Sequence, residues 1–348
     1  MRGIRGIGGQ HGVAHYCLEL ADGRAAFAKV AAVAAGAERA GGGPGDADRV
    51  DGGQVDGGQA GGSQADGGQA GGGPAGGGQA GDGPADGGQA DAWAAGAGLA
   101  AEASGLRWLG AAAAVPVPEV LGGDDYALVV SWIESGAADR RSAIRFGREL
   151  ALLHAAGADR FGAPWPGVIA GLPLPNGPGP GAAGPAAAAG PGGADSGGRS
   201  WADWYAGARL LPYVRLGRDR GALSAGDAAV VEAAAGRVAA VAGPAEPPSR
   251  IHGDCWSGNV LWSGGRGWLI DPAAHGGHRE SDLAMLSLFG APYLREILAA
   301  YQEAVPLADG WAARVPLHQL HPLLVHVCLF GRAYTGSAVA AARAVLVM

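Results

Sequence analysis

The sequence predicts an α+β protein of two lobes, a small N-terminal lobe built on an antiparallel sheet and a larger, mainly helical C-terminal lobe. Two observations lead to this fold class. Patterns typical of strands dominate before Glu134, and patterns typical of helices dominate after it. A glycine-rich tract interrupts the first part and offers few side chains that a core could use. We therefore expect an N-terminal lobe over residues 1–134 and a C-terminal lobe over residues 135–348.

The N-terminal lobe begins with a predicted hairpin followed by a helix. Residues 15–20 and 25–30 have the composition of strands, and the pair Asp22-Gly23 between them favours a tight turn. Across residues 94–112, leucine and alanine recur at the spacing that places them on one face of a helix. The order strand, strand, helix is therefore expected from the start of the chain.

The elements that follow complete the two lobes. Residues 127–133 form a short apolar run that predicts a buried strand, and residues 143–156 show helical spacing again. A second hairpin is predicted from residues 259–262 and 268–271, which are separated by a glycine-containing turn. This hairpin lies inside the part of the chain that is otherwise mainly helical.

Two low-complexity patches interrupt these elements. Residues 51–90 run in glycine-rich units of five, which bury almost no apolar surface and lose much backbone entropy on folding, so disorder is expected over about 40–92. A period of five fits neither the collagen repeat nor the nonapeptide calcium-binding repeat. A second patch, rich in glycine, proline and alanine, predicts a long loop over about 175–198.

Composition excludes several classes of partner. The net charge is −7, and the 25 lysines and arginines form no basic stripe, so nucleic acid is not an expected partner. No run of about 18 apolar residues or signal-peptide core is present, so we expect a cytoplasmic protein that does not bind a membrane. The three cysteines are too far apart in sequence to suggest a disulfide framework or a zinc site. The oligomeric state is left open.

Three polar residues in the C-terminal half have the spacing of a phosphoryl-transfer site. Asp254 and Asn259 are five residues apart, and Asp271 follows twelve residues later at the end of an apolar strand. Phosphoryl transfer needs a carboxylate that takes the proton of the attacking hydroxyl, and oxygen ligands that hold magnesium on the phosphates. Asp254 can be the catalytic carboxylate, while Asn259 and Asp271 can be the metal ligands. Many phosphotransferases would satisfy this pattern.

The surrounding residues narrow the interpretation to one family. The stretch HGDCWSGN at 252–259, followed by IDP at 270–272 and RESDLAML at 279–286, resembles the fructosamine kinase (ketosamine-3-kinase) family. That family is related to the aminoglycoside phosphotransferases, which usually carry other residues between the aspartate and the asparagine. The resemblance implies a protein-kinase-like fold that uses ATP and Mg²⁺.

The resemblance also implies where the N-terminal lobe binds ATP. Gly8 and Gly9 would belong to a glycine loop over the phosphates, Lys29 on the second hairpin strand would contact the phosphates, and Glu102 on the following helix would pair with Lys29. Each has an ordinary alternative: a chance glycine pair, an isolated strand lysine and a solvated helix face. Their order along the chain favours the joint interpretation.

The connection between the lobes would present backbone groups to the adenine edge. The resemblance places this hinge at Ser131, Trp132 and Ile133, which come directly after the predicted apolar strand. The alternative is the ordinary end of a buried strand.

Other residues near the motif are expected to support the site. In related kinases an aspartate in the position of Asp282 braces the catalytic loop, and His252 is expected to orient that loop rather than act as a base. Aromatic side chains could form a platform for a sugar, although core packing is their more common use. The candidates are Trp201, Trp204, Tyr205 and Trp256, with His275, His278 and Glu280 as further candidates for the acceptor pocket.

The function that the resemblance implies is ATP-dependent phosphorylation of the 3-hydroxyl of a ketosamine, such as a fructosamine or ribulosamine, in the repair of glycated protein. The expected partners are ATP and a glycated amine or glycated protein side chain. One alternative is a kinase of the same fold that acts on an aminoglycoside, choline or another small alcohol. Another is an ATP-binding protein without activity, which the long insertion makes conceivable and the intact set Asp254, Asn259 and Asp271 opposes.

Overall fold

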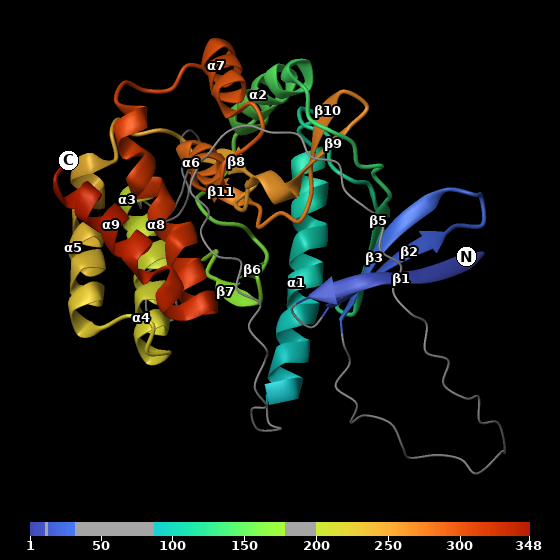
Figure 1. The fold of residues 1–348 in the computed structure, drawn as a ribbon, viewed down its shortest axis with the longest axis horizontal. Helices are drawn as coiled ribbons and strands as arrows, with labels where there is room; N and C mark the ends of the chain where they lie inside the picture. Colours follow the sequence, from blue (N-terminus) through green and yellow to red (C-terminus); the bar gives the residue numbers. More distant parts are fainter. Residues whose placement is uncertain (11–12, 32–86, 178–199) are drawn as a thin grey trace, which may run out of the picture.

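The computed structural model describes residues 1–10, 13–31, 87–177 and 200–348, and it has two lobes (Figure 1). A sheet forms the N-terminal lobe at one end of the molecule, and helices form most of the C-terminal lobe at the other. Most of the two predicted low-complexity segments, 40–92 and 175–198, lies outside the described residues.

The sheet of the N-terminal lobe has five strands in the order β1-β2-β3-β5-β4, and every neighbouring pair is antiparallel. The strands are β1 (Gly3–Gln10), β2 (Val13–Glu19), β3 (Ala25–Ala31), β4 (Val120–Gly123) and β5 (Ala127–Ser131). The predicted hairpin is confirmed as β2 and β3, and the predicted apolar strand is confirmed as β5.

Strand β1 was not predicted as a strand, because half of its eight residues are glycine and glycine disfavours strands. Its backbone pairs with β2 along its whole length, so tertiary pairing overrides the local preference. The register shifts between Gly6 and Gly8, and Gly8 has a positive φ of 130° that suits glycine. The predicted glycine loop is therefore part of an irregular strand.

Helix α1 (Gly87–Gly110) runs between the two lobes (Figure 1). The sequence predicted a helix over 94–112, so the helix begins seven residues earlier, and residues 87–92 are helical where disorder was expected. Leu99, Ala103 and Leu106 of α1 pack against buried apolar side chains of the sheet. Burial of these side chains holds α1 against the sheet.

Among the described residues, the C-terminal lobe contains eight α-helices together with short strands and turns. The helices are α2 (Arg140–Ala155), α3 (Trp201–Tyr205), α4 (Leu211–Asp219), α5 (Ala225–Val241), α6 (Glu280–Phe289), α7 (Leu294–Ala304), α8 (Trp311–Phe330) and α9 (Thr335–Leu346), of which α3 is a short extension leading into the π-helical turn η1 (Ala206–Leu210). The strands are β6 (Gly167–Ile169), β7 (Leu172–Leu174), β8 (Ser249–Ile251), β9 (Val260–Ser263), β10 (Arg266–Leu269) and β11 (His275–Gly277). The 3₁₀ turns are η2 (Ser257–Asn259) and η3 (Gly331–Ala333).

Helix α2 shows why the helical prediction for residues 143–156 succeeds. Asp139 accepts a hydrogen bond from the backbone N–H of Ser142, whose side chain returns a bond to the N-cap, so the first turn is capped. Phe146 and Leu150 lie on the buried face and have no exposed surface. The helix begins three residues before the prediction because the capping residues, rather than the apolar face, set its start.

The predicted second hairpin is confirmed as β9 and β10, which pair antiparallel around Gly264 and Gly265. Both glycines have positive φ, at 57° and 71°, as a two-residue hairpin turn requires. Strands β6 and β7 form another hairpin, and β8 pairs with β11. These strands have three residues each and give too little periodicity to be predicted.

Within the described ranges, no helix is both long enough and apolar enough to cross a membrane. The three cysteines are free thiols.

Candidate active site

The catalytic loop lies between β8 and η2, and His252 fixes its start. The Nε2 atom of His252 is 2.8 Å from the carbonyl oxygen of Ile270, and its Nδ1 atom accepts from the backbone N–H of Asp254 at 3.3 Å. These bonds assign the neutral form with the proton on Nε2. The ring has no exposed surface, and burial lowers the pKa of His252. His252 therefore orients the loop.

Asp282 on α6 holds the same loop from behind. Its carboxylate accepts the backbone N–H groups of His252 at 2.7 Å and Gly253 at 3.0 Å, and it lies 3.1 Å from Nε2 of His154. The hydroxyl of Tyr301 is 2.8 Å from the other ring nitrogen of His154. Burial by itself raises the pKa of Asp282, but the bond to His154 and the other contacts lower it overall. Asp282 is thus a buried anion that braces the loop.

Asp254 and Asn259 are in direct contact. The side-chain nitrogen of Asn259 donates to the backbone oxygen and to a carboxylate oxygen of Asp254, both at 2.9 Å. Burial raises the pKa of Asp254 to about 7, although the bond from Asn259 opposes this shift. The carboxylate is therefore poised to exchange a proton near neutral pH.

Lys29 on β3 joins two other parts of the protein: helix α1, which carries Glu102, and the segment after β10, which carries Asp271. Its ammonium contacts both carboxylate oxygens of Glu102, at 3.0 and 2.8 Å, and lies 2.8 Å from Oδ1 of Asp271. Burial lowers the pKa of Lys29, but the two carboxylates more than compensate and raise it overall. Lys29 is therefore a fixed cation in the wall of the site.

Asp271 has the left-handed backbone conformation, with a φ of 52°. Few residues other than glycine adopt this region, and aspartate is among those that do so most readily. Such conformations occur at functional sites, where the surrounding structure holds them in place. Here the ion pair to Lys29 helps to hold the side chain.

A cavity of about 520 Å³ joins these residues. Its lining includes five of the residues predicted for the site, namely Lys29, Glu102, Asp254, Asn259 and Asp271. It does not include Gly8, Gly9, Ser131, Trp132 or Ile133 among its described lining residues.

In the predicted hinge and glycine loop, backbone groups already pair with neighbouring segments of the chain. The backbone N–H of Ser131 donates to the carbonyl of Glu119 at 2.9 Å, and that of Trp132 donates to the carbonyl of Ala25 at 3.4 Å. A Cβ atom on Gly9 would lie 2.5 Å from the carbonyl oxygen of Val13, so the absence of a side chain lets β1 approach β2 closely. Adenine binding at the hinge and phosphate binding at the glycine pair stay predictions.

The residues present fit a magnesium ion. The side-chain nitrogen of Asn259 is used by Asp254, so a cation would meet its amide oxygen, and Asp271 offers a carboxylate. Both are hard oxygen donors on the wall of the same cavity, and Mg²⁺ prefers one or two such protein ligands together with phosphate oxygens.

The sequence analysis missed His15, which also lines the cavity. His15 lies directly opposite Lys29 in the pairing of β2 with β3. Burial and the neighbouring Lys29 lower its pKa, so the ring is neutral at physiological pH. The predicted hairpin register could have found it, because cross-strand partners share one face of the sheet.

Of the four aromatic residues predicted as a sugar platform, one lines the large cavity. Trp256 lines it, and the ring lies over Gly258, where a Cβ atom would be 2.2 Å from the indole. Trp201, Trp204 and Tyr205 are instead buried in the core of the C-terminal lobe, against a small inner cavity. The suggestion that these three present a sugar platform is therefore wrong, because they pack with the helices of the C-terminal lobe.

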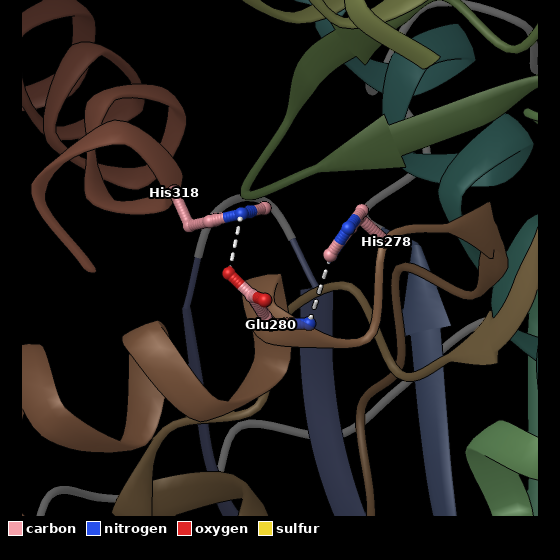
Figure 2. A group of neighbouring side chains, drawn as sticks. All are labelled: His278, Glu280 and His318. Carbon is pink, nitrogen blue, oxygen red and sulfur yellow. Dashed lines mark hydrogen bonds and ion pairs between the residues drawn. The ribbon is translucent and has the colours of Figure 1, made fainter. Parts of the chain in front are cut away.

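The acceptor candidates His278 and Glu280 also lie away from the large cavity, in a buried cluster with His318 (Figure 2). One oxygen of Glu280 is 3.3 Å from Nε2 of His318, and the guanidinium of Arg314 donates to both oxygens. A divalent ion bound here would be repelled by the neighbouring cation of Arg314. The cluster therefore fits a structural contact that holds α6 against α8 better than it fits a metal site.

Comparison with known proteins gives the family. A model of the fructosamine kinase family matches residues 194–348. A Synechocystis protein named as a ketoamine kinase is 33% identical over 242 residues, which cover 67% of this chain and 74% of that protein. The Escherichia coli protein YniA, also named as a ketoamine kinase, is 31% identical over 239 residues, covering 67% and 76% of the two chains.

Solved structures agree with this assignment. A Thermobifida fusca structure that carries the name fructosamine-3-kinase is 40% identical, has a TM-score of 0.74 and covers 99% of this chain and 94% of its own. The gentamicin complex of the aminoglycoside phosphotransferase APH(2″)-IIa has a TM-score of 0.53 at 11% identity, covering 100% and 92%, and shows the shared fold alone. The fold class is thus confirmed, and the chain belongs to the fructosamine kinase family of phosphotransferases with an alcohol acceptor.

Proposed function

We propose that this protein transfers the γ-phosphoryl group of ATP to the 3-hydroxyl of a ketosamine, which is carried by a small amine or by a protein side chain. The observation that carries the proposal is the single cavity that brings together Lys29, Glu102, Asp254, Asn259 and Asp271. Since ATP is the phosphoryl donor, the reaction is expected in the cytoplasm.

Asp254 takes the proton of the attacking hydroxyl. Asn259 holds one carboxylate oxygen in place, so the other oxygen is free to meet the acceptor. Because burial raises the pKa of Asp254 to about 7, the carboxylate is a stronger base than an exposed aspartate and still ionises near neutral pH. Orientation of the hydroxyl against the donor phosphate is the main contribution of the loop.

Lys29 and the metal ligands act on the donor side. Lys29, fixed by Glu102, is placed to contact the phosphates, which can replace Asp271 as its second anionic partner. Asn259 and Asp271 would hold Mg²⁺, which neutralises charge that develops on the phosphates. The low-dielectric wall strengthens the electrostatic contribution of Lys29.

The test is magnesium-dependent consumption of ATP with ribulosyl-lysine, fructosyl-lysine, choline and an aminoglycoside as separate acceptors. We expect turnover with a ketosamine, with the phosphate found at the 3-hydroxyl by NMR. The Asp254→Asn variant should lose at least about 10²-fold in kcat while its affinity for ATP stays within about twofold. Normal turnover by this variant, or turnover on choline or the aminoglycoside alone, would contradict the proposal.

A further inference from the structure

The hairpin β6–β7 forms one wall of the large cavity. Four residues at its tip, 168–171, line the same cavity as Asp254. Ala170 and Gly171 form the turn, and both have positive φ, at 48° and 77°. The tip of the hairpin is therefore part of the wall of this cavity, and a shift of the hairpin would change the shape of the cavity.

One buried residue holds the base of this hairpin. The guanidinium of Arg209 donates to the carbonyl of Pro175 and, at 2.9 Å, to the side-chain oxygen of Asn176, the two residues that follow β7. Asn176 in turn donates to the carbonyl of Trp165, two residues before β6, at 3.2 Å. Arg209 and Asn176, which we call the hairpin clamp, thus tie both ends of the hairpin to the turn η1.

Arg209 is buried in an unusual way. Its side chain is 1% exposed and lies with its guanidinium carbon 4.4 Å over the ring of Trp204. Among the ion pairs of the described residues, none joins Arg209 to a carboxylate. Burial lowers the pKa of Arg209 to about 10, so the group is still a cation at neutral pH. A buried cation is costly, and here the guanidinium donates to backbone carbonyl oxygens and to the side-chain oxygen of Asn176.

The backbone around Arg209 is also irregular. Residues Ala206–Leu210 form a π-helical turn between α3 and α4. Such turns insert an extra residue into a helix and occur often at functional sites. In this chain the turn carries Arg209, whose guanidinium reaches the base of the hairpin.

We infer that Arg209, through Asn176, is a positioning residue for the acceptor. The inference rests on the proposed function, because it assigns the space beside the hairpin tip to the acceptor. On the donor side, Lys29 is fixed by Glu102 and Asp271, and neither Arg209 nor Asn176 bonds to these three residues. Loss of the clamp therefore weakens acceptor binding and leaves ATP binding unchanged.

The kinetic test uses Arg209→Lys, which keeps a positive charge but cannot bond to both Pro175 and Asn176 in the same way. We expect the KM for the ketosamine to rise about tenfold, the range that the loss of one charge-assisted hydrogen bond gives. The KM for ATP should stay within about twofold. Arg220→Lys is the control, because Arg220 donates to the carbonyl of Cys328 and lines neither cavity, and it should change neither KM.

A double-mutant cycle tests whether the two clamp residues act as one unit. Asn176→Ala should raise the acceptor KM by a similar factor, and the double variant with Arg209→Lys should be little worse than either single variant. Additive effects on the acceptor KM would contradict coupling through this bond. Equal rises in both KM values would show a general loss of structure and would overturn the inference.

A second measurement does not depend on the substrate. Amide hydrogen exchange of the wild type and of Arg209→Lys should differ at residues 168–171, with faster exchange in the variant, and agree across α2. Unchanged exchange at the hairpin would overturn the inference even if the kinetics changed. If the wild type phosphorylates no ketosamine, the proposed function fails, while the exchange data still decide whether Arg209 holds the hairpin.

Discussion

At the scale of single residues, the chemistry depends on how burial changes ordinary side chains. Asp254, Lys29 and Asp282 are charged groups in or behind one cavity, and each has a different balance of burial and contacts. Burial is the largest influence on the pKa of all three groups; it prevails at Asp254, whereas the carboxylates around Lys29 together outweigh it, as do the hydrogen bonds and charges around Asp282. The same residue type, aspartate, thus has a raised pKa in one position, which suits the proposed base, and a lowered pKa in the other.

The raised pKa of Asp254 gives a pH dependence with a definite sign. The carboxylate is the active form, and with a pKa of about 7 it is protonated below neutral pH. We therefore expect kcat/KM for the ketosamine to rise about tenfold per pH unit up to about pH 7 and then level off. A profile measured from pH 5 to pH 9 checks this.

The control for this profile varies the partner of Asp254. Asn259 lowers the pKa of Asp254 through its hydrogen bond, so the residual activity of the Asn259→Ala protein should rise with pH around a midpoint higher than that of the wild type. An activity profile that is already flat at pH 5 in the wild type would contradict the role of Asp254 as the base.

At the scale of elements, the site depends on the approach of α1 to the segment after β10, which carries Asp271. Gly105 of α1 faces the segment after Asp271, and a Cβ atom there would be 3.1 Å from the side chain of Ala274. The missing side chain lets the helix pack closely, which brings Glu102 to Lys29 on β3. Helix α1 thus connects the sheet of the N-terminal lobe to the segment that carries Asp271.

The ion pair between β3 and α1 can be tested by Glu102→Gln. The amide keeps the size of the side chain but removes the charge that fixes Lys29, leaving Asp271 as the one carboxylate among the described residues that pairs with Lys29. We expect kcat/KM for ATP to fall at least about tenfold, as is common when a buried charge loses its partner. Glu296→Gln, which weakens an exposed pair with Arg140, is the matched control and should have wild-type activity. Equal activity of both variants would show that the pair does not position Lys29.

At the scale of the whole molecule, both lobes supply walls of one cavity. Lys29 and Glu102 come from the N-terminal lobe, and Asp254, Asn259 and Asp271 come from the C-terminal lobe. A nucleotide with magnesium that bridges these walls binds only the folded arrangement of both lobes. Binding must therefore stabilise the whole protein against unfolding.

Thermal unfolding measures this linkage. With MgATP at about 100 times its Kd, the free energy of unfolding should rise by about 2.7 kcal/mol. Asp271→Asn should reduce the part of this gain that depends on magnesium, while ATP with EDTA should give wild type and variant similar, smaller gains. A magnesium-dependent gain of the same size in the variant would show that Asp271 does not hold the metal.

The predictions from sequence succeeded where a local pattern carries the information. The turn pair Asp22-Gly23 and the apolar run before Ser131 identified strands β2, β3 and β5, because hairpin turns and alternation are local. They failed where pairing overrides propensity, as in the glycine-rich strand β1. For Trp201 they left core packing and a sugar platform open, since an aromatic residue in a core and one in a binding site are alike in sequence, and the structure places it in the core.

By itself, the sequence determined the family, because the residues around Asp254, Asn259 and Asp271 form a local motif, and it named these three as the candidate chemical groups of the site. Only the tertiary structure decided what surrounds them. The buried Arg209, the hairpin tip that it holds and the raised pKa of Asp254 depend on contacts between residues far apart in the chain. Burial and electrostatics are properties of the packed molecule, so no local pattern could give them.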